Sequence, residues 1–163
     1  MTDRVTLTKD NHVGIVTFNR PDKMNALDQA QMEAIIDMAK VIEEDASIRC
    51  VVLTGAGRAY CAGIDVTANF GSLAGGKDAL PKVLPRTHGI TNIWQELVWQ
   101  WREMQVPVIS AVHGVAFGGG LQIMMGSDIR IVAPDTKLAI MEMKWGIIPD
   151  MAGTLLFLSL IHI

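Results

Sequence analysis

The sequence is poor in cysteine, in charge and in long apolar runs. Two cysteines, Cys50 and Cys61, fit reduced core thiols better than a disulfide framework or a zinc site. Charged residues make up 19% of the chain and the net charge is −3, which argues against a dedicated nucleic-acid surface. No apolar run approaches the roughly 20 residues that a membrane span needs. We expect no metal site, because no ligand spacing relates His12, His88 and His162.

Half of the 163 residues are hydrophobic, which is too apolar for a disordered chain. A chain of this length fits one domain, so we expect residues 1–163 to form a single unit. The opening stretch "MTDRVTLTKD" lacks the apolar segment of a signal peptide. We therefore expect a cytoplasmic protein.

The first third of the chain predicts strand, helix and strand. "HVGIVTF" alternates apolar residues at Val13, Ile15 and Phe18, as a strand does. A helix follows, with Asp28 as its N-cap and Gln31 as the capping-box partner. "CVVLTG" is typical of a buried strand. The apolar face of the helix consists of Met32, Ile35, Ile36, Ala39 and Ile42.

The rest of the chain repeats this alternation. Residues 68–87 are rich in Gly and Pro and predict a mobile loop. A helix is expected from about 88 to 104, before Pro107. "VISAV" predicts a strand, residues 118–126 a short helix, "DIRIVA" another strand, and residues 137–150 a strand followed by a turn. The apolar face of the 88–104 helix should hold Ile90, Ile93, Trp94, Leu97 and Trp101. The pattern is that of an α/β fold.

Two glycine-bearing loops each follow a short apolar strand. They are "YCAGID" after "CVVLTG", and "VAFGGGL" after "VISAV". Glycine allows a ligand to approach the backbone closely, and the first N–H groups of a helix lack intrahelical acceptors. Two such donors on one point would stabilise an oxyanion. Close packing of a helix on a strand explains the glycines equally well.

Other motifs are excluded by their spacing. "GAGRAYCAG" does not end in Gly-Lys-Ser/Thr and is no phosphate-binding P-loop, and "FGGGLQ" is no dinucleotide fingerprint. Ser110 is not surrounded by a nucleophile elbow. His113 is expected to be a loop histidine with its hydrogen bonds satisfied.

Four stretches together resemble the enoyl-CoA hydratase/isomerase (crotonase) family. They are "FNRPDKMNAL", "VVLTGAGRAYCAGID", "PVISAVHGVAFGGGLQI" and "DIRIVAPDTKLAIMEMKWGIIPDMAGT". The resemblance is colinear over about residues 4–154. It implies an α/β crotonase-like ββα spiral core and an acyl-CoA thioester as the substrate. No separate cofactor is implied, because coenzyme A is part of the substrate.

The resemblance also implies which residues hold the thioester. The backbone N–H groups of Ile64 and Gly119 would form the oxyanion hole. The helix that starts near Gly119 would add its positive end. The coenzyme A moiety would be held by two loops through Lys23, Met24, Ala26, Ala62, Asp65 and Val66.

The acid/base residues depart from the hydratase pattern. Hydratases of the family place a second acid, besides the one that matches Glu142, where this chain has Gln122. An amide cannot transfer a proton at neutral pH, so the paired-carboxylate hydration mechanism lacks one member. Gln122 can orient a water, hold the substrate or serve a structural role.

Asp150 offers a second carboxylate. Glu142 and Asp150 together resemble the acid/base pair of the dienoyl-CoA isomerases, which also carry an acid at the position of Gln122. The alternatives are an N-cap role for Asp150, a nucleophilic role as in the aromatic acyl-CoA dehalogenases with Trp145 lining the pocket, and a partly solvated strand end for Glu142. We expect double-bond isomerisation, with 2-enoyl-CoA hydration by Glu142 as the alternative.

Family members continue into a further helical region that completes the pocket and builds homotrimers or hexamers. Here the tail "GTLLFLSLIHI" is almost wholly apolar, where the family has a polar helix. We therefore expect a truncated or frame-shifted product whose core edge is exposed. A non-catalytic fragment that retains the core fold is the third alternative for function.

Overall fold

A five-stranded sheet with the order β1-β2-β3-β4-β6 organises the chain. The structure is a computed structural model that describes residues 3–68 and 85–160. β1 and β2 are antiparallel, and β2, β3, β4 and β6 are parallel. The strands span Val5–Asp10 (β1), Val13–Phe18 (β2), Cys50–Gly55 (β3), Val108–Val112 (β4) and Ile129–Val132 (β6). The predicted strands after residue 12 are thus confirmed, whereas most of the predicted 68–87 loop lies outside the described residues, as does His162.

The first strand was not predicted. β1 forms a hairpin with β2 in which Val5 pairs with Phe18 and Asp10 with Val13. In "VTLTKD" only Val5 is buried, and the apolar alternation consists of Val5 and Leu7 alone, which is too short a pattern to predict a strand. The ladder with β2, which runs from Val5 to Asp10, therefore defines this edge strand.

β2 is confirmed as a strand, but the residues on which its prediction rested do not share its buried face. Gly14, Val16 and Phe18 are buried, whereas Val13 and Ile15 are only half-buried. Both faces of this strand carry apolar residues, so the sequence pattern alone did not distinguish them. The fully buried face is the one that packs into the core.

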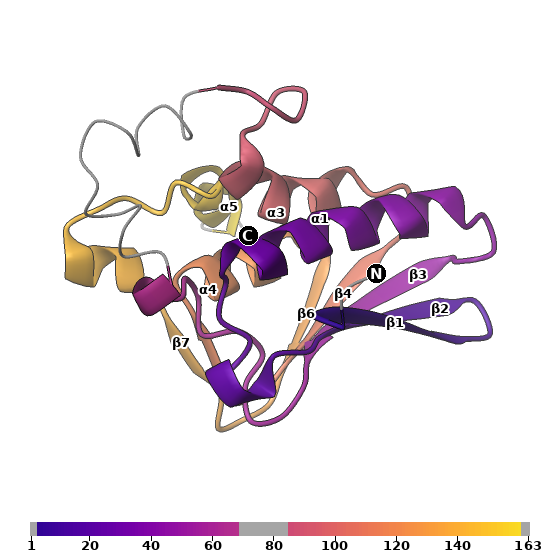
Figure 1. The fold of residues 1–163 in the computed structure, drawn as a ribbon, viewed down its shortest axis with the longest axis horizontal. Helices are drawn as coiled ribbons and strands as arrows, with labels where there is room; N and C mark the ends of the chain where they lie inside the picture. Colours follow the sequence, from indigo (N-terminus) through magenta and orange to yellow (C-terminus); the bar gives the residue numbers. More distant parts are fainter. Residues whose placement is uncertain (1–2, 69–84, 161–163) are drawn as a thin grey trace.

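Helices connect the parallel strands. Figure 1 shows α1 and α3 side by side along one face of the sheet. The helices span Gln29–Glu44 (α1), Ile93–Glu103 (α3), Gly119–Gly126 (α4) and Gly153–Leu160 (α5). Each parallel connection contains a helix, as crossovers between parallel strands require, so the predicted α/β alternation is confirmed.

The start of α1 follows the prediction only in part. Asp28 is the N-cap, and its Oδ1 accepts the Gln31 backbone N–H at 2.8 Å. The expected return bond of the capping box is absent: the Gln31 side chain is fully buried, and its amide atoms have no hydrogen-bond partner among the described residues. All five residues of the predicted apolar face are buried.

The predicted start of α3 is wrong by five residues. The helix begins at Ile93, and the predicted apolar-face residue Ile90 is 61% exposed. A complete capping box fixes this start: Asn92 Oδ1 accepts the Gln95 N–H at 2.9 Å, and the Asn92 N–H donates to Gln95 Oε1 at 3.2 Å. The predicted helix began too early because the spacing of apolar residues continues N-terminal to this capping box.

A second, two-stranded sheet pairs β5 (Val115–Phe117) with β7 (Lys137–Ala139). The sequence analysis placed Val115–Phe117 in a glycine loop and so missed this strand. The predicted turn after β7 is a 3₁₀ helix, η4 (Met141–Trp145). A single bridge between Cys61 and Ala116 ties β5 to the loop after β3. This small sheet therefore brings the two glycine-bearing loops together.

The edge strand β6 leaves apolar side chains uncovered by the described residues. Ile129 is 51% exposed and Ile131 is 63% exposed. β6 pairs only with β4 in the described sheet. Within the described residues, β6 is therefore an edge strand that carries exposed apolar side chains.

Asn92→Ala should lower the free energy of unfolding by about 1 kcal/mol, because the α3 N-terminus loses its side-chain acceptor. Urea denaturation followed by circular dichroism measures the effect. Gln105→Ala, an exposed change just beyond the same helix, is the control. Equal stability of Asn92→Ala and Gln105→Ala would contradict the capping role.

Candidate active site

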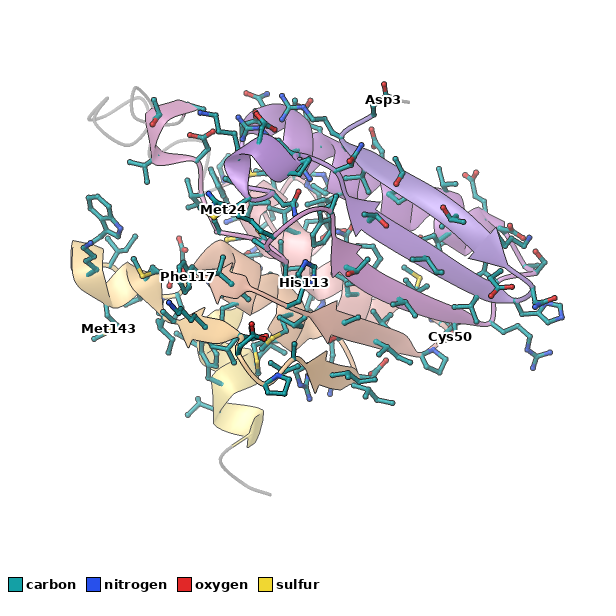
Figure 2. The ribbon with its side chains drawn as sticks, turned by 90° about the horizontal axis from the view of Figure 1, so that it is seen from below. Asp3, Met24, Cys50, His113, Phe117 and Met143 are labelled. Atoms are coloured by element: carbon teal, nitrogen blue, oxygen red, sulfur yellow. The ribbon has the colours of Figure 1, made fainter. Side chains whose placement is uncertain are left out.

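Loops at the carboxyl ends of the parallel strands meet at one edge of the sheet. The 3₁₀ helix η1 (Pro21–Lys23) follows β2, the "YCAGID" loop follows β3, and the glycine turn lies beyond β4 and β5. Figure 2 shows Met24 and Phe117 toward one end of the molecule and Cys50, where β3 starts, toward the other. Ligands of α/β sheets bind at such carboxyl ends, which makes this edge the candidate site.

Asn25 holds the loop after β2 in place. Its side chain is fully buried, Nδ2 donates to the Ala59 carbonyl at 2.8 Å, and Oδ1 accepts the Arg20 backbone N–H at 2.8 Å. The neighbouring Met24 carbonyl accepts the Ala62 N–H at 2.9 Å. These bonds join the two loops that the sequence analysis assigned to coenzyme A.

An ion-pair cluster joins the same loops from the other side. Arg20 lies 2.8 Å from Asp65 and 3.3 Å from Asp28, and it also donates to the Ala26 carbonyl at 2.9 Å. The backbone N–H of Ala68 and the Arg20 guanidinium hold the pKa of Asp65 below its usual range, against the opposing effect of burial. The Asp65 carboxylate is therefore engaged within the protein.

The structure brings all six predicted coenzyme A residues into these two joined loops. Their exposure differs: Lys23 and Val66 are exposed, Met24 and Ala62 are half-buried, and Ala26 is buried. Lys23 thus presents the only exposed positive charge among the six.

The backbone N–H groups of Ile64 and Gly119 lie in neighbouring segments, and no described residue accepts a hydrogen bond from either. The Leu27 N–H donates to the Gly63 carbonyl at 2.7 Å and the Asp65 N–H donates to the Leu27 carbonyl at 3.0 Å, which turns the Ile64 N–H away from Leu27. Gly119 is the first residue of α4. Neither N–H has an acceptor among the described residues. A Cβ on Gly63 would lie 3.4 Å from the Gly119 nitrogen, so the two segments are in contact.

The glycines of this turn serve two different purposes. Gly118 has a φ of +48°, and its N–H donates to the Ala139 carbonyl at 2.9 Å as the chain leaves β5. A Cβ on Gly120 would lie 2.3 Å from the Cys61 carbonyl oxygen. Close packing therefore explains Gly120, while the Gly119 N–H stays available beside it.

Glu142, Gln122 and Gly153 form a buried chain of hydrogen bonds next to this turn. Gln122 Nε2 donates to Glu142 Oε1 at 2.7 Å, and the Gly153 N–H donates to Gln122 Oε1 at 3.0 Å. The second carboxylate oxygen, Glu142 Oε2, is buried and has no partner among the described residues. Glu142 is 7% exposed and lies in η4, so the alternative of a partly solvated strand end is wrong.

Asp150 lies in the turn before α5. The helix begins at Gly153, three residues after Asp150, and the only bond described for the Asp150 side chain is with its own backbone N–H, so the N-cap alternative is wrong. Asp150 is exposed, yet partial desolvation raises its pKa, opposed by its own backbone N–H. Trp145, the proposed aromatic wall, is 61% exposed.

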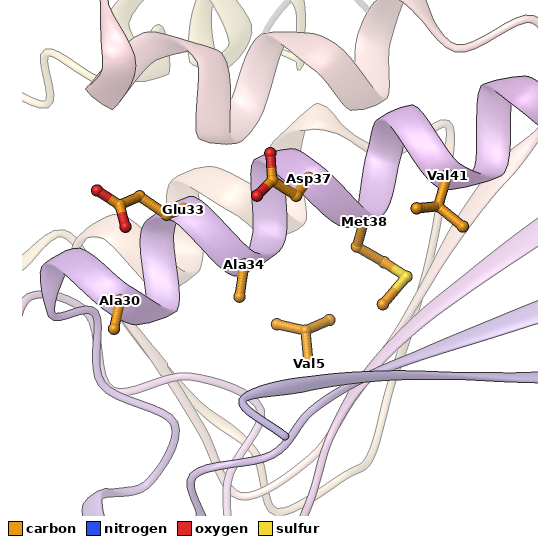
Figure 3. A pocket seen from close by; sticks show the side chains of 7 residues that line it. All are labelled: Val5, Ala30, Glu33, Ala34, Asp37, Met38 and Val41. Carbon is orange, nitrogen blue, oxygen red and sulfur yellow. The ribbon is translucent and has the colours of Figure 1, made fainter. Parts of the chain in front are cut away.

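A surface groove of about 400 Å³ lies between β1 and α1, away from these residues (Figure 3). Its floor is apolar, with Val5 and Met38, and the carboxylates of Glu33 and Asp37 stand at its rim. None of the predicted site residues lines it. The site is therefore defined by the loops and not by this groove.

The cysteines and His113 have structural surroundings. Both cysteines are free, and burial raises the pKa of Cys61 to about 12. His113 contacts the Gly57 carbonyl at 3.0 Å, as expected of a satisfied loop histidine. Within the described ranges, no three His, Cys, Asp or Glu side chains gather as metal ligands, and no helix has the length and apolarity to cross a membrane.

The sequence analysis missed three residues that organise the site: Arg20, Asn25 and Gly153. Arg20 and Asn25 stand inside the stretch "FNRPDKMNAL", but a buried amide or guanidinium that bonds to distant backbone leaves no periodic signal. The role of Gly153 follows only from the hydrogen bond that its N–H donates to Gln122 in the folded chain.

Fold and site together define a crotonase-like α/β protein with two free backbone amides beside a buried carboxylate. The family model for enoyl-CoA hydratase/isomerase matches residues 8–161. The chain therefore belongs to the enoyl-CoA hydratase/isomerase family.

Individual relatives agree with this assignment. The chain is 36% identical over 150 residues to a probable enoyl-CoA hydratase of Bacillus subtilis, covering 92% of this chain and 54% of that protein. It is also 36% identical over 139 residues to the 1,2-epoxyphenylacetyl-CoA isomerase of Escherichia coli, covering 85% and 51%. A solved enoyl-CoA hydratase from Bacillus anthracis superposes with a TM-score of 0.83 at 29% identity, covering 98% and 59%. The chain spans about half the length of the curated relatives it matches.

Asp65→Asn should lower the free energy of unfolding at pH 7 by about 2 kcal/mol, because charged hydrogen bonds to Arg20 and Ala68 are weakened. The folded pKa of Asp65 is lowered, so its stabilisation is present above the unfolded value of about 4 and is lost as the pH falls through the folded pKa. The deficit of the variant should therefore shrink on acidification.

Denaturant titrations between pH 7 and pH 3 measure this. Asp22→Asn, an exposed change in η1 whose carboxylate forms no ion pair with a described residue, should leave the pH dependence unaltered. A deficit of Asp65→Asn that stays constant down to pH 3 would refute the role of the charge.

Proposed function

We propose that the chain carries the catalytic core of a double-bond isomerase that acts on an enoyl-CoA or dienoyl-CoA thioester. One observation carries this proposal. The buried Glu142 is paired with an amide, Gln122, instead of a second carboxylate, beside the free amides of the glycine turn. One ionisable group at this place suits proton transfer between carbon atoms better than the activation of water.

The thioester would bind with its carbonyl oxygen between the N–H groups of Ile64 and Gly119. Removing a proton from the acyl chain leaves an enolate whose charge rests on that oxygen. Each backbone donor in a dry site contributes roughly 3–4 kcal/mol to stabilising such a charge. The N-terminus of α4 adds the positive end of its dipole.

The protons move between the substrate and the two acids. Glu142 Oε2 takes a proton from one carbon, and the electron pair of the broken C–H bond shifts toward the thioester carbonyl. Asp150 returns a proton to the far carbon of the conjugated system, which restores the carbonyl with the double bond moved. The raised pKa of Asp150 favours its protonated form, and its exposure lets it exchange protons with water.

The coenzyme A moiety would lie on the two loops joined by the Met24 and Arg20 contacts. Lys23 offers a positive charge to its phosphates. Met24, Ala26, Ala62, Asp65 and Val66 would shape the rest of this surface. Coenzyme A is part of the substrate, so the proposal includes no separate cofactor. We also propose a cytoplasmic protein that assembles as a homotrimer or hexamer.

The second candidate is 2-enoyl-CoA hydration with Glu142 as the main acid/base. The printed name of the Bacillus subtilis relative, probable enoyl-CoA hydratase, favours it. Gln122 would then orient the attacking water without exchanging protons with it. A non-catalytic chain that keeps the core fold is the third candidate.

Glu142→Gln should lower turnover of a 3,5-dienoyl-CoA by about 10³-fold while acyl-CoA binding changes little, because the shape is kept and the base is lost. Ultraviolet absorbance follows the isomerisation, and hydration of a 2-enoyl-CoA is assayed in parallel. Faster hydration than isomerisation by the unmodified chain would select the hydratase candidate. A folded chain inert toward both substrates would select the non-catalytic one.

Asp150→Asn should lower isomerisation by about 10²-fold, because the second proton transfer loses its donor. The same absorbance assay measures this. Asp135→Asn, an exposed change outside the site, is the matched control. Turnover of Asp150→Asn within twofold of the control would leave Glu142 as the only acid of the reaction.

A further inference from the structure

We propose that Gln122 is a positioning residue that links the start of α5 to Glu142 and leaves Oε2 as the only oxygen of that acid open to substrate. The inference rests on the proposed function for its catalytic meaning. The contacts themselves do not depend on it.

The orientation of the Gln122 amide is fixed by its two partners. The Gly153 N–H can only donate, so it must meet the amide oxygen, at 3.0 Å. The amide nitrogen then faces Glu142 Oε1 at 2.7 Å, which as a carboxylate oxygen accepts. Rotating the amide by 180° would place its NH₂ group against the Gly153 N–H, and its oxygen against the Glu142 carboxylate oxygen. Gln122 is 1% exposed, so water does not compete for either bond.

Two glycines leave the room that this chain of bonds occupies. A Cβ on Gly153 would lie 2.5 Å from Gln122 Oε1, and a Cβ on Gly118 would lie 3.3 Å from Glu142 Oε1. Glycines thus stand where the amide and the carboxylate need room. Any side chain at residue 153 would displace the Gln122 amide and, through it, the acid.

The consequence for Glu142 is an asymmetric carboxylate. Oε1 is held by a charge-assisted hydrogen bond, whereas Oε2 is buried and without a partner among the described residues. A buried carboxylate oxygen without a partner is costly unless a ligand uses it. In the proposed reaction, a carboxylate with one oxygen fixed by Gln122 and the other left for the substrate suits the removal of a proton from a defined carbon. Misplacement of an acid by about 1 Å can cost about 10²-fold in rate.

The kinetic test compares Gln122→Met with Gln100→Met. Methionine keeps the length of the side chain but removes both bonds, and Gln100 is another buried glutamine, on α3 and outside the site. Gln122→Met should lower kcat at least tenfold while KM changes less than about threefold, and Gly153→Ala should follow in the same direction. Gln100→Met should keep both constants. Unchanged kcat in Gln122→Met, or an equal loss in Gln100→Met, would overturn the positioning role.

A spectroscopic test shows whether Gln122 donates to Glu142 even if the chain turns over neither substrate. In ¹H–¹⁵N spectra, the side-chain amide of Gln122 should show slow exchange with water and a downfield proton, as expected of a buried donor to a carboxylate. Both signatures should be lost in Glu142→Met and displaced in Gly153→Ala. An amide signal that is the same in wild type and Glu142→Met would refute the inference. Absent turnover with an intact signature would instead refute the proposed function alone.

Discussion

The contact on which the site depends is the close approach of the α4 N-terminus to the loop after β3. Cys61 pairs with β5 through both of its backbone groups, and its carbonyl lies so near Gly120 that no Cβ fits between them. This contact sets the free N–H of Gly119 beside Gly63 and Ile64. The donors come from segments more than 50 residues apart, so the pair exists only when both sheets are formed.

Polar side chains stabilise what this approach brings together. Asn25 and Arg20 bond to backbone and carboxylates of two loops, which replaces the water that these groups would otherwise bind. The buried Asn25 amide cannot be exchanged for an apolar residue without leaving the Ala59 carbonyl unpaired. The loops after β2 and β3 are thus held by a polar network, whereas α1 and α3 are held by apolar packing.

The sequence predicted the helices and strands that show a regular spacing of apolar residues. It missed the strands and side chains whose place depends on contacts with distant segments. The apolar face of α1 and the strands β3, β4 and β6 follow from residue spacing. β1 and β5 are stabilised by pairing with a neighbouring strand, which spacing does not encode. The resemblance to the family pointed to Gln122 and Glu142, but their hydrogen bond and the anchor at Gly153 required the fold.

In the proposed reaction, the groups that hold the thioester are separate from the groups that move protons. The free amides belong to the Gly63 loop and the first residue of α4, whose positions are fixed by backbone pairing. The acids come from η4 and the turn before α5, where side chains can change without disturbing that pairing. The chain has the family fold with a glutamine at residue 122, and under the proposed function this glutamine changes the reaction open to Glu142. Relatives named hydratase and isomerase can therefore share one architecture, and the chemistry of this chain must be argued from Gln122 and its partners.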